Sequence, residues 1–339
     1  MIRKRIVMML LIACLVLILT GCTGGKEAVA YNDKTTIVCT SFPLYDWVSQ
    51  LTKATDAEVI LLLDNGMDMH SFQPSAEDLI QIADCELLVH VGGESDAWLM
   101  EALEAQPNED RVVINLMDTL ESYLLEEHYS EGMEVCHAHI DGEEHTEECL
   151  DEHSHDEKYD EHLWLSLRIA SVCCEEIERT LCEILPEDAE IINDNTEIYQ
   201  QELQKLDEEY VSAMEGVSQK LIVVADRFPF LYLTEDYGIE YYAAFPGCST
   251  ESEADFETVI FLAEKLDEYK IDTVFITEGG TTDLANAIMS NTEDENRNIV
   301  VLHSMQSVFQ SDIENGASYL GYMKENLEAL RLAMEGYGE

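Results

Sequence analysis

Residues 58–93 read EVILLLDNGMDMHSFQPSAEDLIQIADCELLVHVGG, and this stretch decides the fold. A short apolar run, EVILLLD, is followed by a loop and then by SAEDLIQIAD, whose apolar residues recur with helical spacing. A second apolar run, ELLVHVGG, comes next. A strand, a helix and a strand in this order, with strands too apolar to leave one face in water, predict a parallel sheet covered by helices.

The same alternation runs through two halves of the chain. In the first half, the predicted strands are 35–41, 58–64, 86–93 and 111–116, with helices at 43–52, 75–84 and 95–105. In the second half, the predicted strands are 220–226, 239–247, 272–280 and 298–304, with helices at 227–238, 255–269, 281–291 and 311–335. We therefore expect an α/β protein with two lobes, each built on a parallel four-stranded sheet.

Residues 186–217 separate the two halves and predict one long helix. Pro186 suits a first helical turn, and apolar residues then recur at helical spacing. These residues are Ile191, Ile198, Leu203, Leu206 and Tyr210. The expected organisation is an N-terminal lobe at 36–185, a rigid linker helix at 186–217 and a C-terminal lobe at 218–339.

The N-terminus has the features of a processed leader. Basic MIRKR precedes an apolar run, and Leu-Thr-Gly-Cys follows, which is similar to a bacterial lipobox. This predicts a signal peptide at 1–21, lipid attached to Cys22 and a tether at 22–35. A lipid-anchored protein on the extracytoplasmic face of the cell membrane is expected; a short transmembrane anchor is the alternative.

The charge balance restricts the partners. The chain has 71 acidic and 18 basic residues, for a formal net charge of −53. Such a field repels nucleic acid and attracts cations, although solubility alone also explains it. Once the leader and its lipidated Cys22 are set aside, the remaining cysteines lack the regular spacing of a disulfide scaffold, so no pairing is assigned.

The segment 126–160 is acidic and rich in histidine, without the branched apolar residues that a core needs. It predicts a mobile loop. Its histidines are interpreted as auxiliary zinc scavengers that bind weakly; the alternative is a solvated acidic insert with no transport role. They are His128, His137, His139, His145, His153 and His155.

Three other histidines stand at the ends of rigid elements. His70 follows a predicted strand, His303 ends the last one, and His162 lies where the loop meets an apolar segment. Ligands of open parallel sheets bind beyond the carboxyl ends of the strands, and three imidazoles suit Zn²⁺. Taken singly, each is more often a packing or capping residue, so only their joint placement predicts a metal site. His90, inside a strand, is interpreted as a hydrogen-bonded core histidine.

Two motifs resemble those of the zinc and manganese solute-binding lipoproteins of ABC importers, the cluster A-I family. MDMHSFQPSAEDL (67–79) is similar to the family pattern D-x-H-x-Y/F-x-P-x-x-x-D, and DEHLWLSL (160–167) to D-P-H-x-W-L. STESEADFETV (249–259) resembles a third family motif, and the similarity covers residues 36–335. The resemblance implies two α/β lobes joined by one long helix, in agreement with the pattern above. A His-rich loop before the second motif is typical of the zinc branch.

The chain departs from the family at two ligand positions. Where the family has H-D-A-F-G-Y, this chain has Ala225-Asp226-Arg227-Phe228-Pro229-Phe230, and alanine cannot ligate. Where the family has Asp near the end of the last strand, this chain has His303. We expect an exchange in which His303 is the third imidazole and Asp226 or water completes the shell. Asp226 could instead pair with Arg227 or cap a helix.

The resemblance implies capture of Zn²⁺ as a transported ligand and its delivery to an ABC permease and its ATPase. A monomer without enzyme activity is expected. Zinc is favoured over Mn²⁺, which prefers more oxygen donors. The alternatives are a carrier of manganese or another divalent metal, an adhesin of the same family, and a zinc hydrolase, although no HExxH motif is present.

Overall fold

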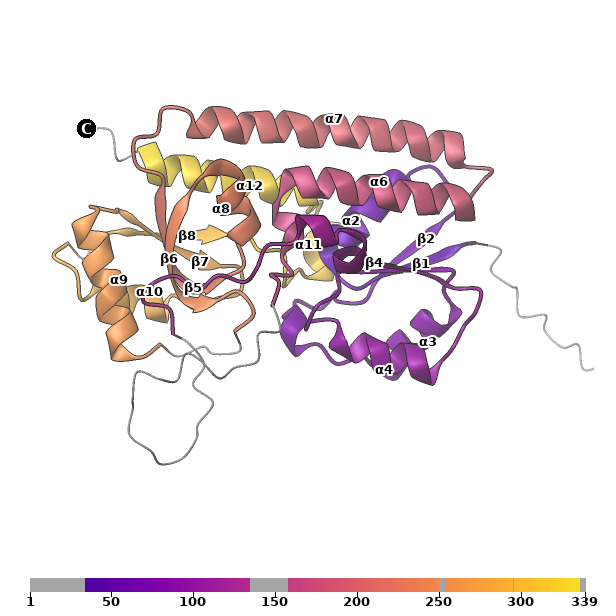
Figure 1. Cartoon of the computed structure of the whole chain (residues 1–339), viewed down its shortest axis with the longest axis horizontal. Coiled ribbons are helices and arrows are strands. Elements are labelled where there is room, and N and C mark those ends of the chain that lie inside the picture. Colours follow the sequence, from indigo (N-terminus) through magenta and orange to yellow (C-terminus); the bar gives the residue numbers. More distant parts are fainter. Residues whose placement is uncertain (1–33, 135–157, 250–253, 295, 336–339) are drawn as a thin grey trace, which may run out of the picture. The chain divides into compact units, whose positions relative to one another are not determined.

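The computed structural model describes residues 34–134, 158–249, 254–294 and 296–335. Two four-stranded sheets dominate these ranges, and all their strand pairs are parallel (Figure 1). The fold class predicted from the sequence is confirmed. None of the described helices is long and apolar enough to cross a bilayer.

The first sheet has the strand order β2-β1-β3-β4. Its strands are β1 (Thr36–Cys39), β2 (Glu58–Leu61), β3 (Leu87–His90) and β4 (Val112–Asn115). The helices around it are α2 (Phe42–Leu51), α3 (Ala76–Asp84), α4 (Ala97–Ala105) and α5 (Leu116–Thr119), with 3₁₀ turns η1 (Met69–Ser71) and η2 (Glu121–Tyr123). The central strands β1 and β3 are almost fully buried, as continuous apolar runs require.

The second sheet repeats this arrangement with the order β6-β5-β7-β8. Its strands are β5 (Leu221–Phe228), β6 (Glu240–Pro246), β7 (Thr273–Thr277) and β8 (Asn298–Leu302). Its helices are α8 (Leu231–Tyr237), α9 (Phe256–Glu268), α10 (Asp283–Met289), α11 (Gln310–Glu314) and α12 (Tyr319–Glu335). Two details differ from the prediction: β5 continues to Phe228, and the final helix is divided into α11 and α12 around Gly316, whose φ of +96° ends the first.

Helix α7 (Ala189–Met214) connects the parts of the chain that carry the two sheets. At about 1.5 Å per residue it is roughly 39 Å long. It packs on α2 and α6 (Leu167–Ile184), and also on α8 and α12, as Figure 1 shows for α6 and α12. Residues 35–339 form one compact unit by their contacts, so the predicted lobe boundaries at 185 and 218 stay predictions.

A backbone connection joins the loop after β2 to the segment before α11. Asn65 and Phe309 form an isolated antiparallel bridge, Gly66 N donates to Val308 O at 3.2 Å, and Gln310 N donates to Asp64 O at 2.6 Å. Gly66 has a φ of +71°, and a Cβ there would lie 2.4 Å from the Phe309 ring. Only glycine allows this close approach.

The segment predicted as a mobile loop has an ordered base. Glu126 and Tyr159 form an antiparallel bridge, and Asp160 N donates to Leu125 O at 2.9 Å. His128 lies here, with Nδ1 3.1 Å from Tyr241 Oη. Outside the described residues lie Cys22, the predicted lipidation site, and the other predicted scavengers, His137, His139, His145, His153 and His155.

Candidate metal centre

His70 is held just beyond the carboxyl end of β2, in the 3₁₀ turn η1. The Asp68 carboxylate accepts a hydrogen bond from His70 N at 3.0 Å and so caps this turn. On the ring, Nδ1 lies 2.8 Å from Ser95 Oγ and 3.6 Å from Glu161 Oε1. These contacts fix the ring plane and leave Nε2 facing away from the first sheet's own loops.

His162 precedes the short 3₁₀ turn η3 (Leu163–Leu165) and is completely buried. Asp160 Oδ1 accepts from His162 N at 2.8 Å and lies 3.0 Å from Nδ1. Trp164 then donates from Nε1 to Ser304 O at 2.8 Å, which ties the segment to the loop after β8. A histidine whose Nδ1 faces a carboxylate is the usual arrangement of a metal ligand that coordinates through Nε2.

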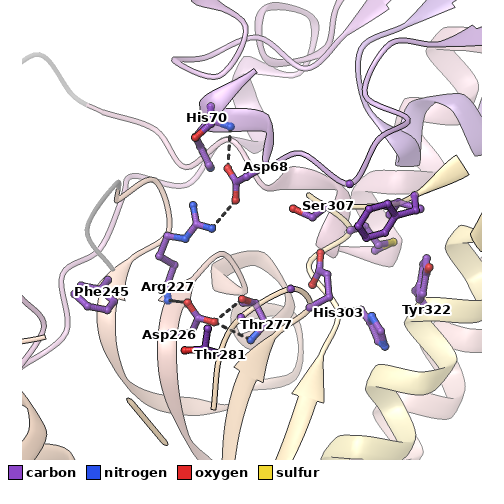
Figure 2. Close-up of a pocket in the computed structure, with 18 of the residues that line it drawn as sticks. Asp68, His70, Asp226, Arg227, Phe245, Thr277, Thr281, His303, Ser307 and Tyr322 are labelled. Atoms are coloured by element: carbon purple, nitrogen blue, oxygen red, sulfur yellow. Dashed lines mark hydrogen bonds and ion pairs between the residues drawn. The ribbon is translucent and has the colours of Figure 1, made fainter. Parts of the chain in front are cut away.

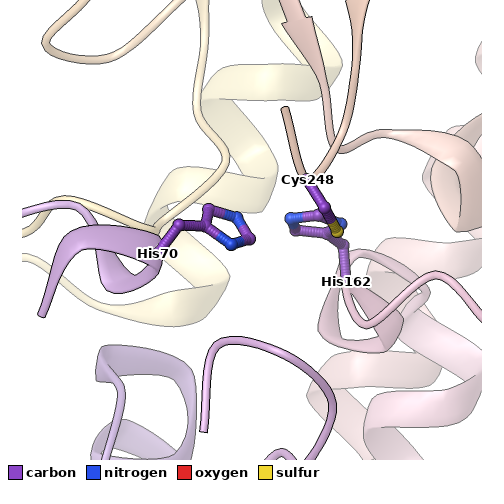
Figure 3. Close-up of side chains that lie close together, drawn as sticks. All are labelled: His70, His162 and Cys248. Atoms are coloured by element: carbon purple, nitrogen blue, oxygen red, sulfur yellow. The ribbon is translucent and has the colours of Figure 1, made fainter. Parts of the chain in front are cut away.

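Cys248 joins these two histidines. Within the described ranges, His70, His162 and Cys248 each offer a donor atom, and the three atoms lie within 4.8 Å of one another (Figure 3). Cys248 is separated from the end of β6 by Gly247, and a Cβ on Gly247 would lie 3.1 Å from Cε1 of His162. The glycine therefore allows the turn to bring the thiol against the imidazole.

Glu161 is the charged neighbour of this cluster. Its Oε1 accepts from Cys248 Sγ at 3.3 Å, and its Oε2 accepts from Ser95 N at 3.1 Å. The side chain is 2% exposed, and burial raises the pKa of its carboxyl group. A divalent cation beside the cluster would reverse this effect by favouring the ionised carboxylate.

The two imidazoles have opposite pKa shifts. Burial and the neighbouring His162 lower the pKa of His70 to about 4, so this ring is neutral at neutral pH. Burial also acts to lower the pKa of His162, but the Asp160 and Glu161 carboxylates together more than offset it, and the net shift is upward. Burial raises the pKa of the Cys248 thiol, which must lose its proton to ligate.

Gln306 bridges the two histidines from the loop after β8. Its side-chain Nε2 lies 2.9 Å from Nε2 of His70 and 2.7 Å from Nε2 of His162. Its Oε1 lies 3.1 Å from Ser304 Oγ, and its backbone N donates to Glu278 Oε1 at 2.9 Å. A side chain from beyond the second sheet is thus in direct contact with both rings.

A cavity of about 680 Å³ opens beside the cluster. His70, Asp226 and His303 all line it (Figure 2). The sequence predicted that these three residues lie in one region, and all three line this cavity. Lining the same cavity does not mean that they bind the same ion.

His303 lies apart from the cluster. Its Nε2 pairs with Glu325 at 3.2 Å, its ring lies against Tyr322 with centroids 4.7 Å apart, and its backbone is bound by Asn326 at N and O. The structure groups Cys248, and not His303, with His70 and His162, so this geometry does not support the predicted exchange, in which His303 supplies the third imidazole and which stays a prediction. The reason is the direction of the side chain after β8, which faces α12.

Asp226 also departs from its predicted role. It lies inside β5, so it caps no helix, and its Oδ2 accepts from Thr277 N at 3.1 Å and from Thr277 Oγ1 at 2.6 Å. Its Oδ1 accepts from Arg227 N, whereas the Arg227 guanidinium pairs with Asp68 across the cavity (Figure 2). With both oxygens engaged by backbone and hydroxyl donors, Asp226 serves to join β5 to β7.

Sequence reasoning missed three residues: Cys248, Glu161 and Gln306. One signal was present for Cys248, because it follows the predicted strand 239–247, as His70 follows the predicted strand 58–64. Glu161 adjoins His162 in the quoted motif. Nothing local marks Gln306, which meets partners 144 and 236 residues away. The interpretation of His90 as a core histidine agrees with the structure, since it is buried with Nδ1 3.3 Å from Asp96.

Two imidazoles and a thiol with an adjacent carboxylate form a donor set suited to Zn²⁺. The chain belongs to the family described as the periplasmic component A of the zinc-uptake complex, ZnuA, whose family model matches residues 37–333. The predicted resemblance is therefore confirmed.

Curated relatives align with nearly the whole length of this chain. The zinc-binding lipoprotein AdcA of Streptococcus pneumoniae strain R6 is 28% identical over 335 residues, covering 99% of this chain and 62% of AdcA. The chain thus spans about three fifths of that relative. The high-affinity zinc uptake system protein ZnuA of Bacillus subtilis is 24% identical over 323 residues, covering 94% of this chain and 95% of ZnuA.

Solved structures share the fold. The Zn(II)-bound ZnuA-like domain of Streptococcus pneumoniae AdcA has a TM-score of 0.68 and 25% identity, over 89% of this chain and 99% of that domain. The periplasmic zinc-binding protein TroA of Treponema pallidum has a TM-score of 0.69 and 20% identity, over 89% and 99%.

Proposed function

We propose that this protein captures Zn²⁺ outside the cytoplasm and delivers it to an ABC permease and its ATPase. The observation that carries the proposal is the convergence of His70, His162 and Cys248, three donors from separate parts of the chain, within 4.8 Å. Membership of the zinc-uptake family and the names of the relatives, which are zinc-binding proteins, support it.

The proposed coordination uses Nε2 of both histidines and the Cys248 thiolate, with Glu161 or water as the fourth donor. Thiolate and imidazole bind zinc at about 2.3 and 2.0–2.1 Å, distances that a cluster of this size accommodates after small side-chain shifts. Mn²⁺ prefers oxygen donors, so a set with one thiolate and two imidazoles disfavours it. His303 and Asp226 contribute to the cavity wall rather than to the shell.

The proposal extends to the rest of the chain. Acylated Cys22 anchors a monomer to the membrane, and histidines of the segment 137–155 collect zinc near the cluster. The ordered base of that segment supports this role, because Asp160 lies both in the base and against His162. Deleting residues 136–155 is expected to slow growth under zinc limitation while leaving the affinity of the purified protein unchanged.

Zinc titration of the purified protein tests the central proposal. A single tight zinc-binding event is expected, with manganese binding far more weakly. His70→Ala and His162→Ala should each weaken zinc binding by several orders of magnitude, while His128→Ala, an exposed histidine outside the cluster, should leave it unchanged. Wild-type affinity in both cluster variants would remove the site.

A further inference from the structure

We propose that the Gln306 carboxamide and the captured cation compete for the same two imidazole lone pairs, so that Gln306 lowers the affinity of the site for the ion that it captures. This inference rests on the proposed zinc capture and deepens it. It concerns how tightly the site holds its ion. The contacts that carry it join His70 and His162 to one amide nitrogen, at 2.9 and 2.7 Å.

The direction of these hydrogen bonds follows from the partners of His162. Its Nδ1 faces the Asp160 carboxylate, which can only accept, so Nδ1 carries the proton. In the neutral ring Nε2 is then an acceptor, and the amide nitrogen of Gln306 is the donor. A primary amide has two N–H groups, one for each imidazole.

The position of this loop has a separate support. The backbone N of Gln306 donates to Glu278 Oε1 at 2.9 Å, and the Ser304 hydroxyl donates to the same oxygen at 2.7 Å. Glu278 also accepts from Ser304 N at 2.6 Å, and this loop is buried, with Gln306 only 6% exposed. Glu278 therefore fixes this loop through three hydrogen bonds, and the loop holds the Gln306 carboxamide against the two rings.

The amide and a cation cannot occupy the space between the two Nε2 atoms at the same time. A zinc ion coordinated by both Nε2 atoms must lie about 2.0–2.1 Å from each, along the lone pairs that the amide protons now engage. An amide nitrogen does not serve as a metal ligand in this state, so the side chain must withdraw before the ion is bound. Binding of an ion therefore requires that two buried hydrogen bonds be broken, and the free energy of breaking them reduces the free energy of binding.

This cost is the same for every ion that binds both imidazoles, so it weakens the binding of each by the same factor. Zinc, which bonds strongly to imidazole and thiolate, keeps a high affinity after the cost is subtracted. Gln306 thus moderates the affinity of the site without being a ligand.

Two substitutions of Gln306 test the inference by zinc titration of the full mature chain against a competing chromophoric chelator. Gln306→Ala and Gln306→Ser are both expected to bind zinc about tenfold more tightly, since the cost of breaking the amide contacts is removed. Gln310→Ala makes the same change at a nearby exposed position and is expected to match the wild type. Thermal melting of each variant verifies that it folds.

Unchanged or weaker zinc binding in folded Gln306 variants would overturn the inference, and weaker binding would identify Gln306 as a ligand. His70→Ala is measured in the same experiment. If this variant loses zinc binding while the Gln306 variants bind zinc no more tightly than the wild type, the competition is refuted and the proposed zinc capture is retained. If His70→Ala binds as the wild type does, zinc capture itself fails. In the unmodified protein, the side-chain amide resonances of Gln306 should shift when zinc is added; resonances that stay in place at saturation would also overturn the competition.

Discussion

Asp160 holds His162 at two points with one oxygen: Oδ1 lies 2.8 Å from the backbone N of His162 and 3.0 Å from ring Nδ1. The carboxylate thereby fixes the position of the residue and the tautomer of its ring together. Because Nδ1 keeps the proton, Nε2 presents its lone pair toward Gln306 and the cluster.

Removing this carboxylate should weaken the site without removing a donor. Asp160→Ala is expected to reduce zinc affinity by about 10- to 100-fold, because the ring loses both its orientation and its preferred tautomer. Competitive titration measures the effect, with exposed Asp194→Ala on α7 as the matched control. Equal affinity in the two variants would contradict the positioning role.

Cys248 should give the bound metal a thiolate signature. Cobalt-loaded wild-type protein is expected to show a sulfur-to-cobalt charge-transfer band in the near ultraviolet, and Cys248→Ser is expected to lose it. Zinc affinity should fall on the order of 100-fold, about 2.7 kcal/mol, while manganese affinity changes little. Cys182→Ser, at a partly exposed cysteine on α6, should retain the band. A band that survives in Cys248→Ser excludes the thiolate.

His303 should be dispensable for zinc binding. His303→Ala breaks the contact with Glu325 and the ring packing on Tyr322, both remote from the donor cluster, so zinc affinity is expected to change by less than about twofold. His70→Ala, measured in the same titration, loses several orders of magnitude. A comparable loss in both variants would restore His303 as a ligand.

Asp46 should make stability depend on pH. It is buried between α2, α7 and α12, where Tyr199 Oη and Tyr319 N donate to it at 3.3 and 3.2 Å. Burial raises the pKa of this carboxyl group in spite of those hydrogen bonds. The folded state therefore binds the proton more tightly than the unfolded state, so stability falls as pH rises from the ordinary pKa through the raised one and stays lower above it.

Asp46→Asn removes the ionisation and keeps an oxygen for both donors. The variant is expected to melt about 2 °C above the wild type at pH 7, with the difference vanishing in acid. The difference is measured from the melting temperatures of the metal-free proteins at pH 7 and in acid, and Asp194→Asn serves as the control. A difference between variant and wild type that is the same at both pH values would rule out the ionisation of Asp46 as its cause.

Much of the fold could be predicted because its signals are local. The strands around Val38 and Leu88 are continuous apolar runs and proved to be buried in parallel sheets. The apolar residues of α7 recur at helical spacing along one face, and Leu203, Leu206 and Tyr210 are buried. His70 was predicted as a ligand because it follows a strand, and His162 because it lies where the loop meets an apolar segment; the structure brings the two side chains together.

The rest of the site depends on contacts that no local pattern encodes. His303 follows buried Leu302, and consecutive side chains at a strand end point in opposite directions, so its ring faces α12. Cys248 meets His162 only because Gly247 allows the turn to approach the ring. Gln306 reaches both imidazoles because Glu278 fixes its loop.

The antiparallel bridge between Asn65 and Phe309 has a mechanical consequence. It ties the chain just before His70 to the chain just after Gln306, through backbone hydrogen bonds that the absence of a side chain at Gly66 permits. Displacement of one of these segments is therefore expected to displace the other. His70 and Gln306 would then move together rather than independently.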